Sequence, residues 1–133
     1  MSINPWFYAY AAALLVLGLL DGLWLGWVAR DFYRREVGDL MAAEVAKIPA
    51  AIFYFAYPAG LLALALNPLP ANATAAMARA ALVGLVVYGV YDLTNMATLR
   101  HWSLKLALVD VAWGVLVSAV AGTAAWFALQ RQV

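Results

Sequence analysis

Four long apolar stretches dominate the sequence and leave it one kind of fold. A helix that crosses a bilayer needs about 20 largely apolar residues, because the hydrocarbon layer is about 30 Å thick and each helical residue rises about 1.5 Å. The stretches that reach this length are approximately Trp6–Ala29, Ile48–Leu66, Ala78–Leu99 and Leu104–Leu129. They lack the two-residue alternation that is typical of strands. The sequence therefore predicts one all-α domain over residues 1–133, a polytopic membrane protein built as a four-transmembrane-helix bundle.

The composition makes a lipid bilayer the expected partner of this chain. Hydrophobic residues make up 68% and charged residues 11%, whereas soluble domains have about 45–50% apolar and about 25% charged residues. A chain of 133 residues cannot bury so much apolar surface within itself. The net charge of +1 argues against a nucleic-acid partner, which requires a basic face. Because the chain has no cysteine, disulfides and iron–sulfur clusters are excluded, and no cofactor is predicted.

The connection between the first two stretches has two interpretations. Apolar residues within 31–46 fall near one helical face, which is typical of an interfacial amphipathic helix lying against the headgroups. Gly38 in the middle of this segment favours a break and therefore an ordinary loop. The residues leave both interpretations open.

The distribution of positive charge predicts the orientation of the chain. With four spans, the first and third connections share one side of the membrane, and both termini share the other. Cytoplasmic connections of membrane proteins carry an excess of Lys and Arg. The first and third connections hold Arg30, Arg34, Arg35, Lys47, Arg100 and Lys105, and the opposite side holds Arg79 and Arg131. We therefore expect these two connections in the cytoplasm and both termini outside.

Three aspartates interrupt the apolar stretches: Asp21 in the first, Asp92 in the third and Asp110 in the fourth. A charged group at bilayer depth costs roughly 2.5–3.5 kcal/mol and usually faces the interior of the bundle. Counted from the nearest basic residue at the cytoplasmic end, the three lie roughly 13, 12 and 8 Å deep. The sequence thus predicts a layer of carboxylates in the cytoplasmic half. Because ionised carboxylates repel one another, we expect this layer to share a proton or a cation.

Other polar side chains are predicted at the same depth. The second stretch contributes two tyrosines next to Pro58, and in the third stretch Tyr88, Asp92 and Asn95 share one helical face. The predicted ligand-binding or proton-relay residues are Asp21, Tyr54, Tyr57, Tyr88, Tyr91, Asp92, Thr94, Asn95, Asp110 and Trp113. Hydrogen bonding between helices explains part of such a set. Inward-reaching Arg100, His101 or Lys105 would instead make it a structural salt-bridge network. No metal site is predicted, because no helix carries two carboxylates at ligand spacing.

Small residues recur every fourth position in two of the stretches. Gly18, Gly22 and Gly26 lie in the first stretch, and a second series, Gly114, Ser118 and Gly122, lies in the fourth. Such stripes let helix backbones approach closely. We predict that the first and fourth helices pack along these stripes, which would bring Asp21 near Asp110. The alternative is a homodimer seam on one of them.

An Asp-x-x-Trp motif occurs twice, on helices that run in opposite directions. Asp21 precedes Trp24 in the first stretch, and Asp110 precedes Trp113 in the fourth. Inverted repeats of this kind occur in transporters. Because so few residues match in a Trp-rich chain, we interpret the motif as a coincidence.

The third and fourth stretches resemble a known bacterial membrane-protein family. The string Tyr91-Asp92-Leu93-Thr94-Asn95-Met96-Ala97-Thr98-Leu99-Arg100, followed by Trp102 and by Asp110 with Trp113 and Gly114, is similar to the signature of the domain of unknown function 2177. Further similarity lies in Asp21, Trp24, Leu25 and Gly26, in Tyr33, Gly38 and Leu40, and in Phe53-Tyr54 through Gly60. The resemblance implies a four-helix protein of the bacterial inner membrane, with both termini then periplasmic. It names no substrate.

Three classes of function fit these features. The first is the binding or movement of a small polar or amphipathic ligand at the layer of carboxylate, tyrosine and asparagine side chains. Proton transfer is an optional part of this function. The second is an accessory subunit or assembly factor of a membrane complex, or a homodimer. The third is an enzyme acting on a lipid or isoprenoid, with Asp92 as acid or base. The sequence holds no motif that decides whether a reaction is catalysed.

Overall fold

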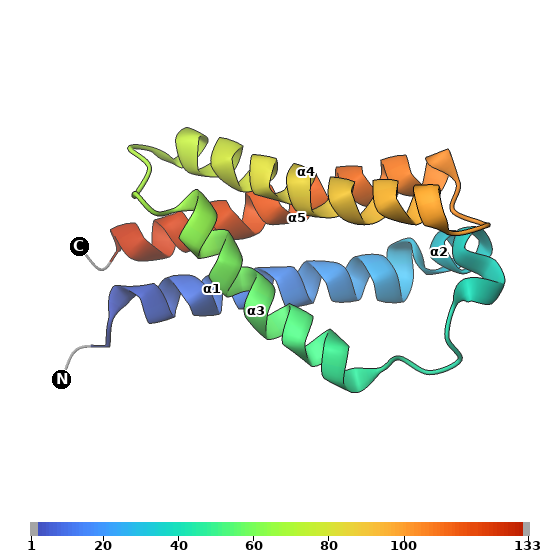
Figure 1. The fold of residues 1–133 in the computed structure, drawn as a ribbon. Coiled ribbons are helices and arrows are strands. Elements are labelled where there is room, and N and C mark those ends of the chain that lie inside the picture. Colours follow the sequence, from blue (N-terminus) through green and yellow to red (C-terminus); the bar gives the residue numbers. More distant parts are fainter. Residues whose placement is uncertain (1–2, 132–133) are drawn as a thin grey trace.

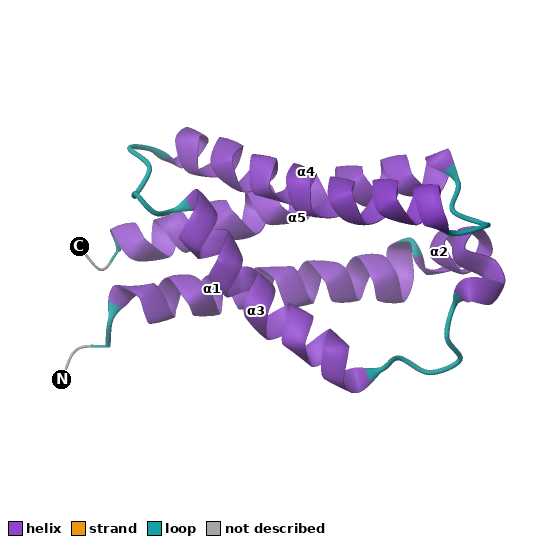
Figure 2. Ribbon diagram, viewed as in Figure 1, coloured by secondary structure: helices purple, strands orange, loops and turns teal. Residues whose placement is uncertain are grey.

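The computed structural model describes residues 3–131, and between these positions every regular element is a helix (Figure 2). The helices are α1 (Pro5–Leu23), α2 (Arg30–Val37), α3 (Lys47–Ala65), α4 (Ala73–Thr98) and α5 (Leu104–Gln130). A π-helical turn, η1 (Trp24–Val28), extends α1, and a 3-10 turn, η2 (Gly38–Leu40), follows α2. Four helical segments are long and apolar enough to cross a membrane: Pro5–Val28, Lys47–Ala65, Ala73–Thr98 and Leu104–Gln130. The predicted all-α fold with four transmembrane helices is confirmed.

Local sequence explains where the spanning helices begin and end. The Asn72 side chain accepts a hydrogen bond from the Ala75 backbone N–H at 2.8 Å, so α4 begins at Ala73. This start lies five residues before the predicted one at Ala78, because the polar cap rather than the apolar run sets it. α3 ends at Ala65, before the Asn-Pro-Leu-Pro segment, since proline cannot continue a helix and disfavours helical geometry in the residue before it.

The segment between α1 and α3 is part helix and part irregular chain, and its position against the headgroups stays a prediction. Its first half is the short helix α2, and its second half, after η2, lacks regular structure as far as Ala46. Gly38 divides the two halves with a backbone φ of 61°. Side chains disfavour this conformation, whereas glycine adopts it at no steric cost. The glycine therefore sets where α2 ends.

The four spanning helices do not contribute equally to the bundle (Figure 1). α1, α4 and α5 lie along a common axis, and α3 crosses them obliquely. Both ends of the chain lie at one end of the bundle, and α2 lies at the opposite end. The first half of α3, from Lys47, diverges from the other helices and is largely exposed, whereas Leu61, Leu62 and Ala65 in its second half are buried.

α4 and α5 make the closest helix pair through two stripes with a four-residue period. The α4 stripe consists of Ala76, Ala80, Gly84, Tyr88 and Asp92, and the α5 stripe consists of Leu106, Asp110, Gly114, Ser118 and Gly122. A Cβ built on Gly84 would lie 2.5 Å from the Gly114 carbonyl oxygen, and one on Gly122 would meet Ala80. A Cβ on Gly114 would enter the Tyr88 ring. The antiparallel register of these stripes places Asp92 beside Asp110.

The first and fourth helices pack together as predicted, but the glycine stripe of α1 is not the face that makes the contact. α1 packs on α5 through Ala9, Ala13, Leu17 and Asp21, all of which are buried. The face with Gly18, Gly22 and Gly26 is exposed, and nothing described in residues 3–131 lies within 4 Å of a Cβ built there. The small residues of α5 pack on α4 instead, because α4 carries its own small stripe in matching register. The homodimer alternative for the α1 glycines stays a prediction.

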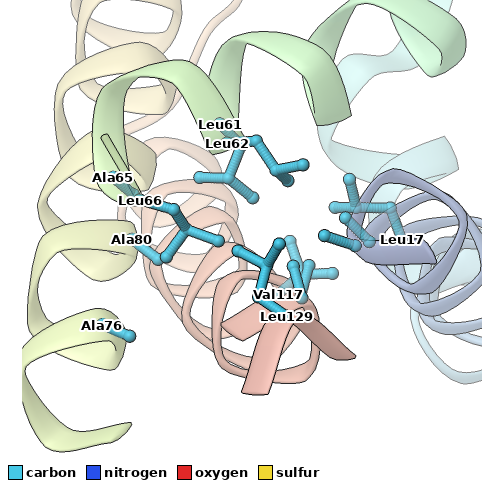
Figure 3. Close-up of a cluster of buried hydrophobic side chains, with 13 residues drawn as sticks. Leu17, Leu61, Leu62, Ala65, Leu66, Ala76, Ala80, Val117 and Leu129 are labelled. Carbon is cyan, nitrogen blue, oxygen red and sulfur yellow. The ribbon is translucent and has the colours of Figure 1, made fainter. Parts of the chain in front are cut away.

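The bundle is divided along its axis into an apolar half and a polar half. The apolar core joins α1 as far as Leu17, the second half of α3 with Leu66 after it, the start of α4, and α5 from Val117 onward (Figure 3). Its labelled members are Leu17, Leu61, Leu62, Ala65, Leu66, Ala76, Ala80, Val117 and Leu129. These residues lie toward the end that holds both termini. The half toward α2 contains the buried aspartates.

Candidate functional site

All three intramembrane aspartates are buried inside the polar half. Asp21 is 4% exposed, Asp92 is 0% exposed and Asp110 is 9% exposed. Each continues a helix stripe that packs against a neighbouring helix, which explains why the three carboxyls turn inward. Because a buried carboxyl costs free energy unless it is hydrogen-bonded, the hydrogen-bond partners of the three side chains matter for stability.

Asp21 connects three of the spanning helices. Its Oδ1 accepts a hydrogen bond from the Trp113 indole N–H of α5 at 2.8 Å. Its Oδ2 accepts one from the Tyr54 hydroxyl of α3 at 3.2 Å. Both oxygens thus have a donor from another helix. Asp21 therefore has the properties of an interhelical connector.

Asp110 is held by a residue outside the spans. The Tyr33 hydroxyl of α2 donates to Asp110 Oδ1 at 2.7 Å, and the Trp24 indole N–H donates to the same hydroxyl at 3.2 Å. Burial raises the pKa of Tyr33, and the neighbouring Asp110 carboxylate adds to this effect. Tyr33 therefore keeps its proton and remains a donor, so that α2 is anchored to α5 through this hydrogen bond.

The two Asp-x-x-Trp motifs interlock across α1 and α5. The rings of Trp24 and Trp113 stack with their centroids 4.5 Å apart and an interplanar angle of 6°. Trp113 donates directly to Asp21, and Trp24 acts on Asp110 through Tyr33. Each tryptophan thus supports the aspartate of the other motif by hydrogen bonding, directly for Trp113 and through Tyr33 for Trp24. The repeated motif therefore has a structural role.

Asp92 is the least satisfied of the three carboxyls. Its Oδ1 accepts a hydrogen bond from the Trp102 indole N–H at 3.1 Å. Within residues 3–131, its buried Oδ2 has no hydrogen-bond partner. The Asp110 carboxyl lies beside it. A buried oxygen without a donor is costly unless it carries a proton or meets a ligand.

A pocket of about 510 Å³ opens beside this pair of carboxyls. It lies between η1, α2, η2, α4 and the start of α5. Its lining residues are Leu25, Tyr33, Val37, Leu40, Met41, Tyr91, Asn95, Leu99, Trp102 and Asp110. Small-molecule sites typically have volumes of about 300–1,000 Å³, with mainly apolar walls and a few convergent polar groups. This pocket meets that description, and Asp110 is its carboxylate.

The segment from α2 to η2 covers one side of the pocket. Val37, Leu40 and Met41 line it from this segment. The Ser103 hydroxyl donates to Glu36 Oε2 at 2.8 Å, which holds the end of α2 against the start of α5. Together with the Tyr33–Asp110 hydrogen bond, this contact keeps the segment in place. Opening of the pocket on this side therefore requires two hydrogen bonds to break.

A larger hollow of about 790 Å³ lies between α1 and α3, toward the end with the termini. Trp6, Tyr10 and Phe55 are among its lining residues, and no carboxylate lines it. The Tyr10 hydroxyl donates to the Phe55 carbonyl at 2.7 Å across this hollow. It is more open and mostly apolar, as expected of a lipid-filled gap beside an oblique helix. We therefore place the candidate site at the smaller pocket.

The structure brings some of the sequence-predicted site residues together and separates others. Asp21, Tyr54, Trp113, Asp92 and Asp110 form the buried layer, and Tyr91 and Asn95 reach the pocket wall. Tyr57 instead lies 2.7 Å from Ser118 Oγ, and the Tyr88 ring packs on Gly114. Thr94 is exposed, and it donates to the Val90 carbonyl of its own helix. Indole and phenol groups supply the described hydrogen bonds to the three carboxyls, rather than the basic residues of the salt-bridge alternative.

Three residues of the site are absent from the sequence-based set: Trp24, Tyr33 and Trp102. Tyr33 and Trp102 lie outside the spans, so a search by depth does not find them. The signal that favours Trp24 is its place in the repeated motif, and Trp102 lies close to the decapeptide from Tyr91 to Arg100.

The chain was compared with models of known protein families. The model of a family described as "Predicted membrane protein (DUF2177)" matches residues 6–127. No curated protein and no solved structure matches the chain.

Proposed function

The chain belongs to the DUF2177 family of predicted membrane proteins, and from this premise we propose that it binds a small amphipathic molecule in the pocket beside Asp110. The observation that carries the proposal is the pocket itself. An apolar wall and a single carboxylate meet in a volume of about 510 Å³ at the edge of a buried polar layer.

The lining of the pocket offers groups that suit two parts of one ligand. Leu25, Val37, Leu40, Met41 and Leu99 offer an apolar surface to a hydrocarbon body. The Asp110 carboxylate, the Asn95 amide and the Tyr33 hydroxyl supply hydrogen-bond acceptors and donors for a polar head. For a molecule with both parts, burial of the hydrocarbon and hydrogen bonds to the head both favour binding.

We also propose that the protein lies in a bacterial inner membrane with the pocket at the cytoplasmic side. Six of the eight basic residues lie between Arg30 and Lys47 or at the α4–α5 connection, and the other two are Arg79 and Arg131. Basic residues near the ends of spans favour the cytoplasmic side. Both termini then face the periplasm, and the ligand enters from the inner leaflet or the cytoplasm.

Because the natural sequence has no cysteine, a single introduced thiol tests both proposals. Asn95 lines the pocket, and Leu93 on the same helix is 65% exposed on the outer surface of the bundle. In sealed inverted vesicles, the thiol of Asn95→Cys should react with a membrane-impermeant reagent at least about tenfold faster than that of Leu93→Cys, since lipid excludes the reagent from Leu93. In right-side-out vesicles both thiols should be protected.

If the two thiols reacted at equal rates in inverted vesicles, the proposal of a water-accessible pocket would be contradicted. If Asn95→Cys reacted in right-side-out vesicles and not in inverted ones, the chain would have the opposite orientation to the proposed one. Both variants replace residues that donate or accept no described interhelical hydrogen bond, so each is expected to fold.

A further inference from the structure

We infer that the pocket takes a monovalent organic cation, an amine or quaternary ammonium group with an apolar body, and that the Asp92–Asp110 pair binds it while sharing one proton. This inference deepens the proposed ligand-binding function by naming the chemical class of the ligand. It rests on the geometry of the two carboxyls, on the charges around them and on the rings of the pocket.

The geometry of the pair accounts for one proton. The carboxyls of Asp92 and Asp110 lie side by side, and both are buried. Two adjacent buried carboxylates cannot both ionise at low cost, because like charges repel and burial disfavours the charged form. A proton held between them removes the repulsion and also gives the otherwise unpartnered Asp92 Oδ2 a hydrogen-bonding role. The pair then carries a single negative charge.

The groups facing the pair add no positive charge. The titratable groups that interact electrostatically with Asp110 are Asp21 of α1, Tyr33 of α2, and Tyr88 and Tyr91 of α4. All of these groups are acids, and the phenols are neutral at physiological pH. The Asp21 carboxyl already has two donors. The charge of the pair is therefore left for a ligand to neutralise.

The pocket wall suits an organic cation better than a metal ion. The rings of Tyr33, Tyr91 and Trp102 line the pocket together with Asp110, and such rings attract ammonium groups through their π faces. Hard metal ions require several oxygen ligands. Within residues 3–131, no group of three or more His, Cys, Asp or Glu side chains gathers around one point. The apolar remainder of the wall suits a hydrocarbon body.

The two aspartates have different parts in this arrangement. Asp110 lines the pocket, whereas Asp92 is 0% exposed and does not line it. Asp110 therefore faces the cation, and Asp92 holds the proton behind it. An asparagine closely matches a protonated carboxyl in shape and charge. Asp92→Asn should then keep the negative charge on Asp110, and Asp110→Asn should remove the cation's partner.

The test is a calorimetric titration of the protein in nanodiscs of zwitterionic lipid. The probe is benzyltrimethylammonium, and its matched control is neopentylbenzene, in which carbon replaces the charged nitrogen. We expect the wild type to prefer the cation, and Asp110→Asn to weaken cation binding about tenfold or more. Asp92→Asn should stay within about threefold of the wild type, because threefold is less than 1 kcal/mol. Lowering the pH should weaken binding to the wild type, since a second proton on the pair competes with the cation.

Tyr91→Leu keeps the test usable if Asp110→Asn does not fold. Tyr91 is 54% exposed and donates no described hydrogen bond, so its loss should spare the fold while removing one ring from the cation. Cation binding should weaken, and binding of neopentylbenzene should not.

Three results would overturn the inference. They are a wild type that does not bind the cation, an Asp110→Asn variant that binds it unchanged, and an Asp92→Asn variant that loses it as fully as Asp110→Asn. If neopentylbenzene binds as well as the cation and protects Asn95→Cys from its thiol reagent, the cation class fails while the proposed ligand pocket stands. If the Asn95→Cys thiol is inaccessible, the pocket itself fails.

Discussion

Replacing Gly84 with alanine should destabilise the protein by about 3 kcal/mol, the upper end of the usual range for overpacking. The added Cβ would lie 2.5 Å from the Gly114 carbonyl oxygen and 2.6 Å from Ser118 Oγ. The first of these atoms belongs to backbone, which cannot rotate away. α4 and α5 would have to separate, and their separation would also part Asp92 from Asp110. The free energy of unfolding in mixed micelles, titrated with a denaturing detergent, measures this effect.

Gly89→Ala is the matched control, because it adds the same methyl group to the same helix. Nothing described lies within 4 Å of a Cβ at Gly89. Alanine also has the higher helix propensity, by about 1 kcal/mol. This control should therefore be neutral or stabilising. Equal effects of the two substitutions would contradict the close α4–α5 packing.

Replacing Trp113 with alanine should cost about 3–5 kcal/mol, as for other large aromatic residues that pack in a core. The variant loses the stack on Trp24 and the hydrogen bond to Asp21 Oδ1. It also leaves the Asp21 carboxyl with Tyr54 as its remaining described donor. A buried acceptor that loses its donor adds to the cost of the lost packing. Thermal unfolding followed by circular dichroism measures the loss.

Trp27→Ala gives the control for this prediction. Trp27 lies in η1, three residues from Trp24, and is 78% exposed on the outside of the bundle. Its replacement should change stability by less than about 1 kcal/mol, within the range of surface substitutions. If Trp27→Ala were as harmful as Trp113→Ala, the interlocked tryptophan pair would not be what joins α1 to α5.

The fold was largely predictable because bilayer thickness fixes the length of a spanning helix. Four apolar runs predicted four spans, and polar residues at depth indicated the inward faces. The faces through which the helices pack were less predictable. The glycines of α1 match a common packing motif, yet they face outward, because α4 offers α5 a small-residue stripe that fits its own. Whether a small-residue stripe packs against another helix depends on the residues of both helices. The sequence of one helix alone does not reveal it.

The site was predictable only where depth and helix periodicity determine it. These rules place Asp21, Asp92 and Asp110 inside, and they also predict Tyr57 and Thr94 as site residues. The second pair finds partners elsewhere, in Ser118 and in the α4 backbone. Tyr33 and Trp102 could not be found in this way, because the connections that carry them fold back against the bundle. For Tyr33 the sequence signal was the apolar face within residues 31–46, which does not reveal what that face packs against.

The central claim is that the space beside Asp110 holds a ligand, and native mass spectrometry of the gently extracted protein tests it most directly. Asn95→Trp fills the pocket, whereas Val90→Trp adds a similar side chain to an exposed position of α4. We expect one small molecule bound to each wild-type chain and to each Val90→Trp chain, and none bound to Asn95→Trp. The same bound mass on Asn95→Trp, or no bound molecule on the wild type, would contradict the claim.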